Sequence, residues 1–204
     1  LMIQGGFGAG GAEKIMCELA HHRAAGGDEV HVAAMRMPKT GSFLTYAPEI
    51  QLHVLDPSTR RPPAAIMQPK RALAIRRLIR EVQPDLIISF LTKVNCLTLL
   101  AASGTGIPVV ISERNNPTIQ SPHFWRRLQL ALMPRAAGIA MQTRAAAADL
   151  RPAQAARAHV IPNHCNAVEF TRPEPATHCR FVAAGRLDHQ KGFDLLLEAF
   201  AQMP

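Results

Sequence analysis

The segment Pro84-Asp85-Leu86-Ile87-Ile88-Ser89-Phe90 decides the fold of this chain. A turn pair, Pro84-Asp85, introduces a continuous apolar run of the kind that is buried on both faces of a parallel sheet. A helix is expected to follow over residues 94–103, and Gly106-Ile107-Pro108 then leads into a second apolar strand at 109–111. Strand, helix and parallel strand in this order form the repeating unit of doubly wound α/β folds.

The same alternation of strand and helix signals extends in both directions from this unit. Further strands are expected at residues 1–3, 30–34, 52–55, 138–141 and 159–161. Further helices are expected at residues 12–24, 69–82, 124–133 and, with Thr143 as the N-cap, 144–150. We therefore predict a doubly wound, Rossmann-like parallel sheet over residues 1–165. Residues 166–204 are predicted to form a linker, rich in proline, and then the first strand and helix of a second domain.

Composition limits the chain to one complete core. Of 204 residues, 48% are hydrophobic and 19% are charged, which suffices for one domain and leaves little for a second. Every apolar run is shorter than the roughly 20 residues that span a bilayer, and no signal peptide is recognisable. We expect a cytoplasmic protein, represented here by a piece truncated at both ends. The widely spaced cysteines are expected to be reduced thiols that pack in the fold: Cys17, Cys96, Cys165 and Cys179.

The net charge of +8 indicates an anionic partner. Nucleic acid is disfavoured, because the chain has one Trp and one Tyr and no segment that interleaves basic and aromatic residues. Phosphorylated small molecules and anionic lipid fit better. In the helix expected at 69–82, one face carries Lys70, Arg76, Arg77 and Arg80. This face is either an ordinary solvated surface or a surface that rests on an acidic membrane leaflet.

The segment Gly185-Arg186-Leu187-Asp188-His189-Gln190-Lys191-Gly192 has the pattern of a diphosphate site. It lies between a strand-like run at 181–184 and a helix-like run at 193–200. A glycine-flanked turn therefore offers Arg186 and Lys191 at a helix N-terminus, where backbone N–H groups and the helix dipole favour anions.

The glycine-rich segment at residues 6–11 satisfies G-x-G-x-x-G between a strand and a helix, which favours a dinucleotide site. Two observations oppose that interpretation. The second strand leads to Arg36 rather than to the acidic residue that would hold a ribose hydroxyl. Glu13 in the first helical turn would also repel a pyrophosphate. An NADP-dependent oxidoreductase, with Arg36 reading the 2′-phosphate, remains an alternative.

Five motifs in this order together resemble the retaining glycosyltransferases of family 4: Gly10-Gly11-Ala12-Glu13-Lys14, Ser112-Glu113-Arg114-Asn115-Asn116-Pro117, Trp125-Arg126-Arg127, Val160-Ile161-Pro162-Asn163, and Gly185-Arg186-Leu187 with Lys191-Gly192-Phe193. The form Ser-Glu-Arg-Asn most resembles bacterial enzymes of lipid-linked oligosaccharide and exopolysaccharide synthesis. The resemblance implies the GT-B fold, in which two Rossmann-like domains face each other. The domain at 1–165 would bind the acceptor, and the one that begins within 166–204 would bind the nucleotide sugar.

The resemblance also implies roles for single residues. Arg186 and Lys191 would bind the donor diphosphate and stabilise the charge that develops on the leaving phosphate. Gly10, Gly11 and Gly185 would let the backbone approach the donor.

Three further positions have alternatives that the sequence leaves open. Arg114 would lie near the transferred sugar, or alternatively form a salt bridge with Glu113. Asn115 would contact the substrate, or simply form a turn before Pro117. Asn163 would contribute to substrate binding, or alternatively be a hinge-strand residue at the exit from the domain, where His164-Cys165 departs from the family's usual Gly-Val or Pro-Val.

The expected reaction is transfer of a sugar, with retention, from a nucleotide sugar, expected to be UDP-linked, to a saccharide or lipid-linked saccharide. No metal or other cofactor is expected, because the two cations would supply the countercharge that Mg²⁺ otherwise provides. The chain ends before the pair of glutamates that the family carries late in the second domain. We therefore expect these 204 residues alone to have no transferase activity and weak nucleotide affinity. A non-catalytic, acceptor-binding subunit is the other alternative, and association with the cytoplasmic face of a membrane is a further expectation.

Overall fold

The computed structural model describes residues 1–56, 64–114, 122–165, 181–185, 187 and 189–203. The chain divides into two compact units, residues 1–165 and 166–204.

The first unit is built on one seven-stranded sheet with the strand order β3-β2-β1-β4-β5-β6-β7. The strands are β1 (Met2–Gln4), β2 (His31–Ala34), β3 (Gln51–Val54), β4 (Ile87–Phe90), β5 (Val109–Glu113), β6 (Gly138–Met141) and β7 (Ala158–Val160). Every neighbouring pair is parallel. Strand order reverses direction between β1 and β4, which is the switch point of a doubly wound sheet. The predicted fold class is therefore confirmed, and all seven expected strands of this unit are present.

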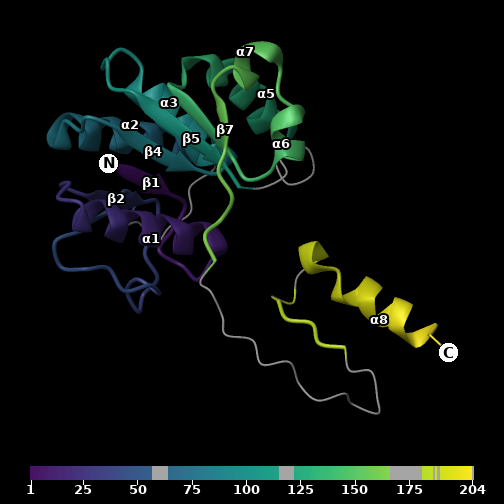
Figure 1. Ribbon diagram of the computed structural model, residues 1–204. Coiled ribbons are helices and arrows are strands. Elements are labelled where there is room, and N and C mark those ends of the chain that lie inside the picture. The colour runs from purple at the N-terminus through teal and green to yellow at the C-terminus, as the bar shows by residue number, and fades with distance from the viewer. Residues whose placement is uncertain (57–63, 115–121, 166–180, 186, 188, 204) are drawn as a thin grey trace. The chain divides into compact units, whose positions relative to one another are not determined.

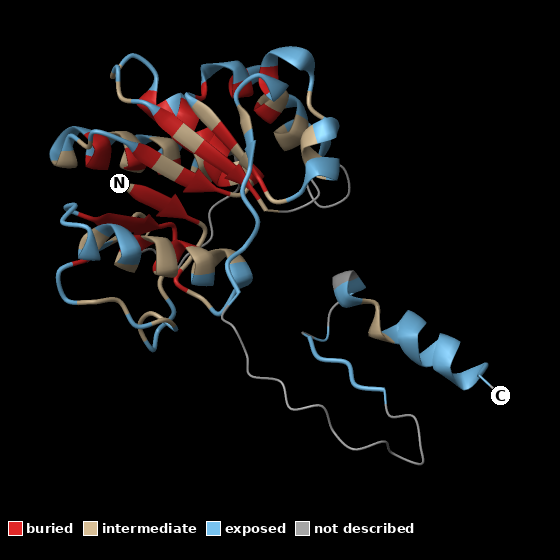
Figure 2. Ribbon diagram, in the orientation of Figure 1, coloured by how far each residue is buried: buried red, intermediate tan, exposed pale blue. Residues whose placement is uncertain are grey.

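Helices cover both faces of the central strands (Figure 1). They are α1 (Gly11–Ala25), α2 (Ala64–Val82), α3 (Thr92–Ala102), α5 (His123–Leu132), α6 (Arg144–Ala148) and α7 (Pro152–Ala155), with a 3₁₀ turn η1 (Met133–Arg135) after α5. Met16 and Ala20 of α1 pack in one core cluster with Val32 and Phe90. The opposite face of the sheet forms a second cluster with α2, α3 and α5, as the buried interior in Figure 2 shows.

Two local features differ from the sequence prediction. Helix α2 begins at Ala64, so Pro69, which we expected to open the helix, lies inside it. A proline this close to the start removes a single intrahelical hydrogen bond, and the apolar face of α2 packs regardless. The short helix α7 was not predicted; its Gln154 side chain accepts a hydrogen bond from the Arg151 backbone N–H. The predicted cap is confirmed, because Thr143 Oγ1 accepts from the Ala146 N–H at 3.1 Å.

The described part of the second unit contains a 3₁₀ turn, η2 (His189–Lys191), and helix α8 (Phe193–Ala201). Residues 181–184, which were expected to form a strand, have no regular secondary structure. A strand is stabilised by hydrogen bonds to a neighbouring strand, and the described residues of this unit offer none. The helix begins where predicted, after Gly192, whose φ of +62° favours glycine.

No helix in the described ranges is long and apolar enough to cross a membrane. Cys17 and Cys96 are buried thiols, as expected. Burial raises the pKa of the Cys96 thiol to about 12, with a further contribution from the charge of Glu113. These two cysteines therefore pack in the core as neutral thiols, whereas Cys165 is exposed and Cys179 lies outside the described residues.

Candidate functional site: the carboxyl edge of strands β5 to β7

A row of polar side chains follows the carboxyl ends of three adjacent strands. Arg114 comes directly after β5, Gln142 directly after β6, and Asn163 three residues after β7. The Arg114 guanidinium and the Gln142 amide both donate to Asn163 Oδ1, the latter at 2.9 Å. Ligands of doubly wound sheets bind at this edge, so the row has the position of a substrate site.

The Arg114 guanidinium is held from two further sides. Its Nε donates to Ser112 Oγ at 3.1 Å, and its Cζ lies 4.3 Å from the centroid of the Phe90 ring. Burial lowers the pKa of Arg114 from its ordinary value, although a guanidinium remains protonated at neutral pH. A cation that has lost part of its hydration interacts more strongly with an anion or a polar hydroxyl, because the local dielectric is low.

Glu113, the last residue of β5, is 3% exposed and joins three elements. Its Oε2 accepts hydrogen bonds from Thr92 Oγ1 at 2.8 Å and from Gln129 Nε2 at 2.6 Å, and its Oε1 accepts from the Arg114 backbone N–H at 3.2 Å. The guanidinium of Arg114 is directed instead at Ser112 and Asn163. The buried carboxylate thus fixes the end of β5 against α3 and α5 and so positions Arg114.

From the sequence, Glu113 was expected only as an alternative salt-bridge partner of Arg114, and Thr92 and Gln129 had no expected role. An acidic residue at the end of an apolar strand, with a threonine opening the preceding helix, was the signal available. The pairing itself depends on strand register, which places Phe90 beside Ser112 and so brings the start of α3 next to the end of β5.

A cavity of about 720 Å³ lies beside this network, between α5 and α6. Arg114, Glu113 and Gln142 contribute polar groups to its wall, and Arg126 lines it from α5. Its remaining lining is largely apolar, with Leu130, Met133, Met141 and Leu150. A pocket of this size with a few polar groups on an apolar floor suits a small organic ligand.

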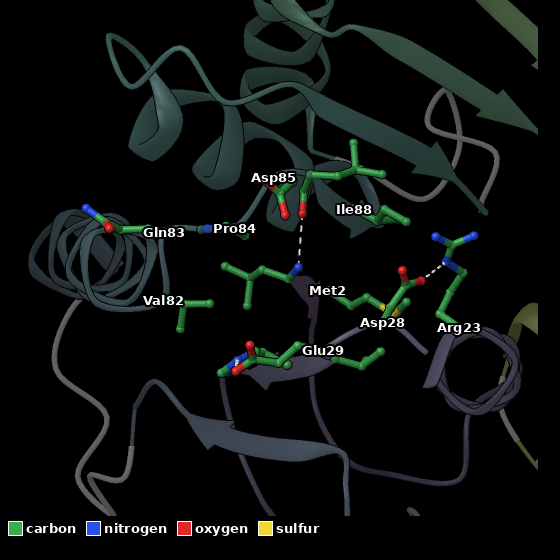
Figure 3. Close-up of a pocket in the computed structure, with 13 residues that line it drawn as sticks. Met2, Arg23, Asp28, Glu29, Val82, Gln83, Pro84, Asp85 and Ile88 are labelled. Atoms are coloured by element: carbon green, nitrogen blue, oxygen red, sulfur yellow. Dashed lines mark hydrogen bonds and ion pairs between the residues drawn. The ribbon is translucent and has the colours of Figure 1, made fainter. Parts of the chain in front are cut away.

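A second cavity, of about 250 Å³, lies at the opposite, amino edge of the sheet (Figure 3). The amino group of Leu1 donates there to the Leu86 carbonyl at 2.9 Å, and Arg23 forms an ion pair with Asp28 at its rim. Because the polar row and the glycine-rich loop both lie at the carboxyl edge, this second cavity is not the candidate site.

The glycine-rich loop lies at the same carboxyl edge as Arg114 but does not belong to its hydrogen-bonded network. Gly10 is the N-cap of α1 and Gly11 its first residue, and both are exposed. Open space surrounds the position of a side chain at Gly11, whereas one at Gly10 would meet the Glu13 carboxylate. Strand β4 separates β1 from β5, so the two groups lie two strands apart.

In the second unit, the predicted diphosphate residues are only partly described. A Cβ on Gly185 would lie 3.2 Å from the Phe193 ring and 3.5 Å from Cγ of Lys191, so these three residues lie close together. Lys191 is exposed at the end of η2, just before α8. Arg186 lies outside the described residues, as does Asn115 of the first unit.

Residues 9–167 match the family described as Glycosyltransferase Family 4. The chain belongs to glycosyltransferase family 4. A curated relative from Campylobacter jejuni, GalNAc-alpha-(1->4)-GalNAc-alpha-(1->3)-diNAcBac-PP-undecaprenol alpha-1,4-N-acetyl-D-galactosaminyltransferase, is 34% identical over 65 residues, which are 32% of this chain and 18% of the relative.

Solved structures show the same fold. MurG of Acinetobacter baumannii matches 81% of this chain and 46% of its own, at 21% identity and a TM-score of 0.59. Alr3699/HepE of Anabaena, solved with UDP and glucose, matches 81% of this chain and 44% of its own, at 18% identity and a TM-score of 0.56. This family 4 chain thus spans less than half the length of these structures, and the Rossmann-like α/β fold predicted for its first unit is confirmed.

Proposed function

We propose that this family 4 chain is part of a glycosyltransferase that transfers a sugar, with retention, from a UDP-sugar to a saccharide or lipid-linked saccharide. The observation that carries the proposal is the family match over residues 9–167. The polar row at the carboxyl edge and the neighbouring cavity support it, because they supply hydrogen-bond donors beside a space of sugar size. The relatives support the substrate classes, because one is a transferase that acts on a lipid-linked saccharide and another was solved with UDP and glucose.

In this proposal the two units have different tasks. Residues 1–165 bind the acceptor, and residues from 166 onward begin the domain that binds the nucleotide sugar. Arg186 and Lys191 neutralise the donor diphosphate as the glycosidic bond breaks, so the chemistry needs no metal. The leaving phosphate and the acceptor hydroxyl then interact on the same face of the sugar, which gives retention without a protein nucleophile.

Arg114 is proposed to contact the transferred sugar. Its charge is partly desolvated and its direction is fixed by Ser112, Phe90 and Asn163. A donor whose direction is already fixed can hold a hydroxyl group of the sugar in place without having to reorganise during the reaction. Gly10 and Gly11, which carry no side chain, leave the backbone at the start of α1 accessible to the donor.

The direct test is an activity assay on a protein in which residues 1–204 are followed by a complete second domain. Incubation with UDP-N-acetylhexosamine or UDP-glucose and a lipid-linked saccharide should add one sugar, detected by mass spectrometry, and EDTA should not abolish the reaction. Replacing both Arg186 and Lys191 by Ala should lower turnover at least 100-fold. Unchanged turnover in the double variant, or binding of the acceptor without any transfer, would contradict the proposal; the latter indicates a non-catalytic subunit.

We also propose that the enzyme rests on an anionic membrane through one face of α2. Lys70, Arg77 and Arg80 are exposed on this face, together with Leu73, which is 48% exposed. The sequence prediction had included Arg76, but its guanidinium donates to the carbonyls of Ala101 and Ser103 and is not available to lipid. Cationic side chains around an exposed leucine match the acidic headgroups and apolar interior of a leaflet.

Co-sedimentation with vesicles tests this surface. Vesicles with 30% phosphatidylglycerol should retain the protein at low salt and release it at high salt, because exposed charges are screened. The triple variant Lys70→Gln, Arg77→Gln, Arg80→Gln should remain in solution, whereas Arg135→Gln, an exposed charge elsewhere, should sediment like the wild type. Equal sedimentation with neutral vesicles would contradict an electrostatic contact.

A further inference from the structure

Two cationic residues follow the strands on either side of β1. Arg36 comes two residues after β2, and Lys93 comes three residues after β4, as the second residue of α3. Strand β1 lies between β2 and β4 in the sheet. Neighbouring strands lie about 4.8 Å apart, so the two chain segments are separated by about 10 Å, and long side chains from both can reach one small group above the end of β1.

Neither cation is neutralised within the part of the chain that the structure describes. The ion pairs found there do not include Arg36 or Lys93. The nearby Asp56 carboxylate accepts hydrogen bonds from Nε and Nη2 of Arg71, at 3.2 and 3.0 Å, and Arg71 is 7% exposed. The Asp56 carboxylate is therefore already engaged by the buried guanidinium of Arg71.

The charges of this cluster act on one another. Burial, together with the charges of Arg71 and Arg36, lowers the pKa of the Lys93 ammonium from its ordinary value. Like charges that are held together and partly desolvated destabilise the protein unless an anion joins them. The cluster therefore has the electrostatics of an anion site.

The position of Lys93 is fixed by its surroundings. Its Nζ lies 5.3 Å from the centroid of the Trp125 ring, which restricts the ammonium to one region. The preceding Leu91 has a φ of +77° and a ψ of 141°, a conformation that costs a non-glycine residue on the order of 1–3 kcal/mol. Strain of this kind persists only where the surrounding structure enforces it.

The enforcing contacts are buried hydrogen bonds around Asn95, which is 0% exposed. Its Oδ1 accepts from Ser89 Oγ at 2.8 Å, and its Nδ2 donates to the Ser112 carbonyl at 3.0 Å. The Leu91 backbone N–H donates to that same carbonyl at 3.0 Å. These hydrogen bonds thus fix the conformation of the turn between β4 and α3, and the turn determines the position of Lys93 at the start of α3.

We propose that Arg36 and Lys93 together bind a phosphate group of the acceptor, as in a saccharide linked to lipid through a diphosphate. This inference rests on the proposed function, because it takes the acceptor to be bound by residues 1–165. The forked guanidinium can bind two phosphate oxygens while the ammonium meets a third, and two positive charges match a phosphate better than a single carboxylate. The donor diphosphate is proposed to bind Arg186 and Lys191 in the other unit, which leaves this pair for the acceptor.

The test is calorimetric titration of the 204-residue chain with farnesyl diphosphate, farnesol and UDP, as the wild type and as the variants Arg36→Gln and Lys93→Gln. We expect farnesyl diphosphate to bind at least tenfold more weakly to each variant, and farnesol to bind weakly to all three proteins. The matched control is Arg135→Gln, which removes an exposed charge from η1, at the amino edge of the sheet, and should bind like the wild type. Circular dichroism and thermal unfolding establish that the variants are folded.

Three outcomes would overturn the inference. Farnesyl diphosphate could bind both variants as tightly as the wild type, or farnesol could bind the wild type as tightly as farnesyl diphosphate. Weakening of UDP binding by the same factor would assign the pair to the donor instead of the acceptor. No sugar is transferred in these titrations, so absence of transferase activity in the longer protein and absence of phosphate binding here are separate results.

Discussion

The Arg114 guanidinium lies 4.3 Å from the centroid of the Phe90 ring, so the last residue of β4 forms the surface on which the residue after β5 is stacked. A planar guanidinium can stack on a ring and donate to Ser112 and Asn163 at the same time. A lysine ammonium at this position is not planar, so it cannot stack on the ring, and it lacks the forked pair of N–H groups of a guanidinium.

This relationship predicts the effect of Arg114→Lys. In the protein with a complete second domain, kcat/KM should fall roughly 10- to 100-fold, although the net charge is unchanged, because the cation is no longer held in one direction. Arg135→Lys, at an exposed position in η1, is the matched control and should retain full activity. Steady-state kinetics on both variants distinguish orientation from charge; wild-type kinetics for Arg114→Lys would rule out an oriented contact.

Glu113→Gln should destabilise the fold. The carboxylate accepts hydrogen bonds from Thr92, Gln129 and the Arg114 backbone. In glutamine an NH₂ group replaces one of the two accepting oxygens, and its N–H groups would face other donors and leave them unsatisfied. We expect a loss of about 1–3 kcal/mol in the free energy of unfolding, measured by urea denaturation. Glu49→Gln, at an exposed position, should change it by less than about 0.5 kcal/mol. Equal stability of the two variants would show that the buried network is energetically unimportant.

Arg76→Gln tests the corrected description of the basic face of α2. Its Nη1 donates to the Ala101 and Ser103 carbonyls, at 2.7 and 2.8 Å, and so satisfies the C-terminal end of α3. We expect a loss of about 1–2 kcal/mol in unfolding free energy. Arg77→Gln removes the neighbouring exposed charge and should be nearly neutral for stability while weakening vesicle binding. If Arg76→Gln instead weakened vesicle binding and left stability unchanged, Arg76 would belong to the membrane-binding face, as the sequence predicted.

The sequence was sufficient for the sheet, because each parallel strand is a short apolar run between turn residues. It misplaced the start of α2, where Pro69 was taken as the first residue, and it missed α7, which has only four residues. The prediction of a strand at 181–184 was wrong for a different reason, because a strand needs a partner strand and residue preference alone does not determine it.

Candidate site residues were predictable to a smaller extent. Arg114 and Asn163 were both singled out from motifs, but their contact joins residues 49 positions apart and depends on how β5, β6 and β7 are aligned. The role of Glu113 was open for the same reason: its partners come from α3 and α5, and no local pattern identifies them. The functional roles of all the candidate residues remain predictions: Arg114, Asn163, Arg186, Lys191, Gly185, Gly10, Gly11 and Asn115.

A histidine pair outside the candidate site predicts how stability depends on pH. His31 Nδ1 and His53 Nε2 lie 2.9 Å apart, with the rings stacked, and His31 Nε2 lies 3.1 Å from Glu29 Oε1. Burial, followed by the neighbouring charge of His31, lowers the pKa of His53, and Glu81 only partly opposes this. The folded state therefore favours neutral His53, whereas an unfolded histidine takes up its proton near pH 6.5.

As the pH falls below about 6.5, His53 takes up a proton in the unfolded chain but resists doing so in the folded protein. The free energy of unfolding therefore decreases progressively below that pH. His53→Gln should flatten this dependence, because the glutamine amide can donate to His31 Nδ1 without titrating. His159→Gln removes an exposed histidine and should leave the slope unchanged. Urea denaturation from pH 5 to 8 measures all three proteins. A slope that is identical in the wild type and in His53→Gln would mean that the pair does not couple protonation to folding.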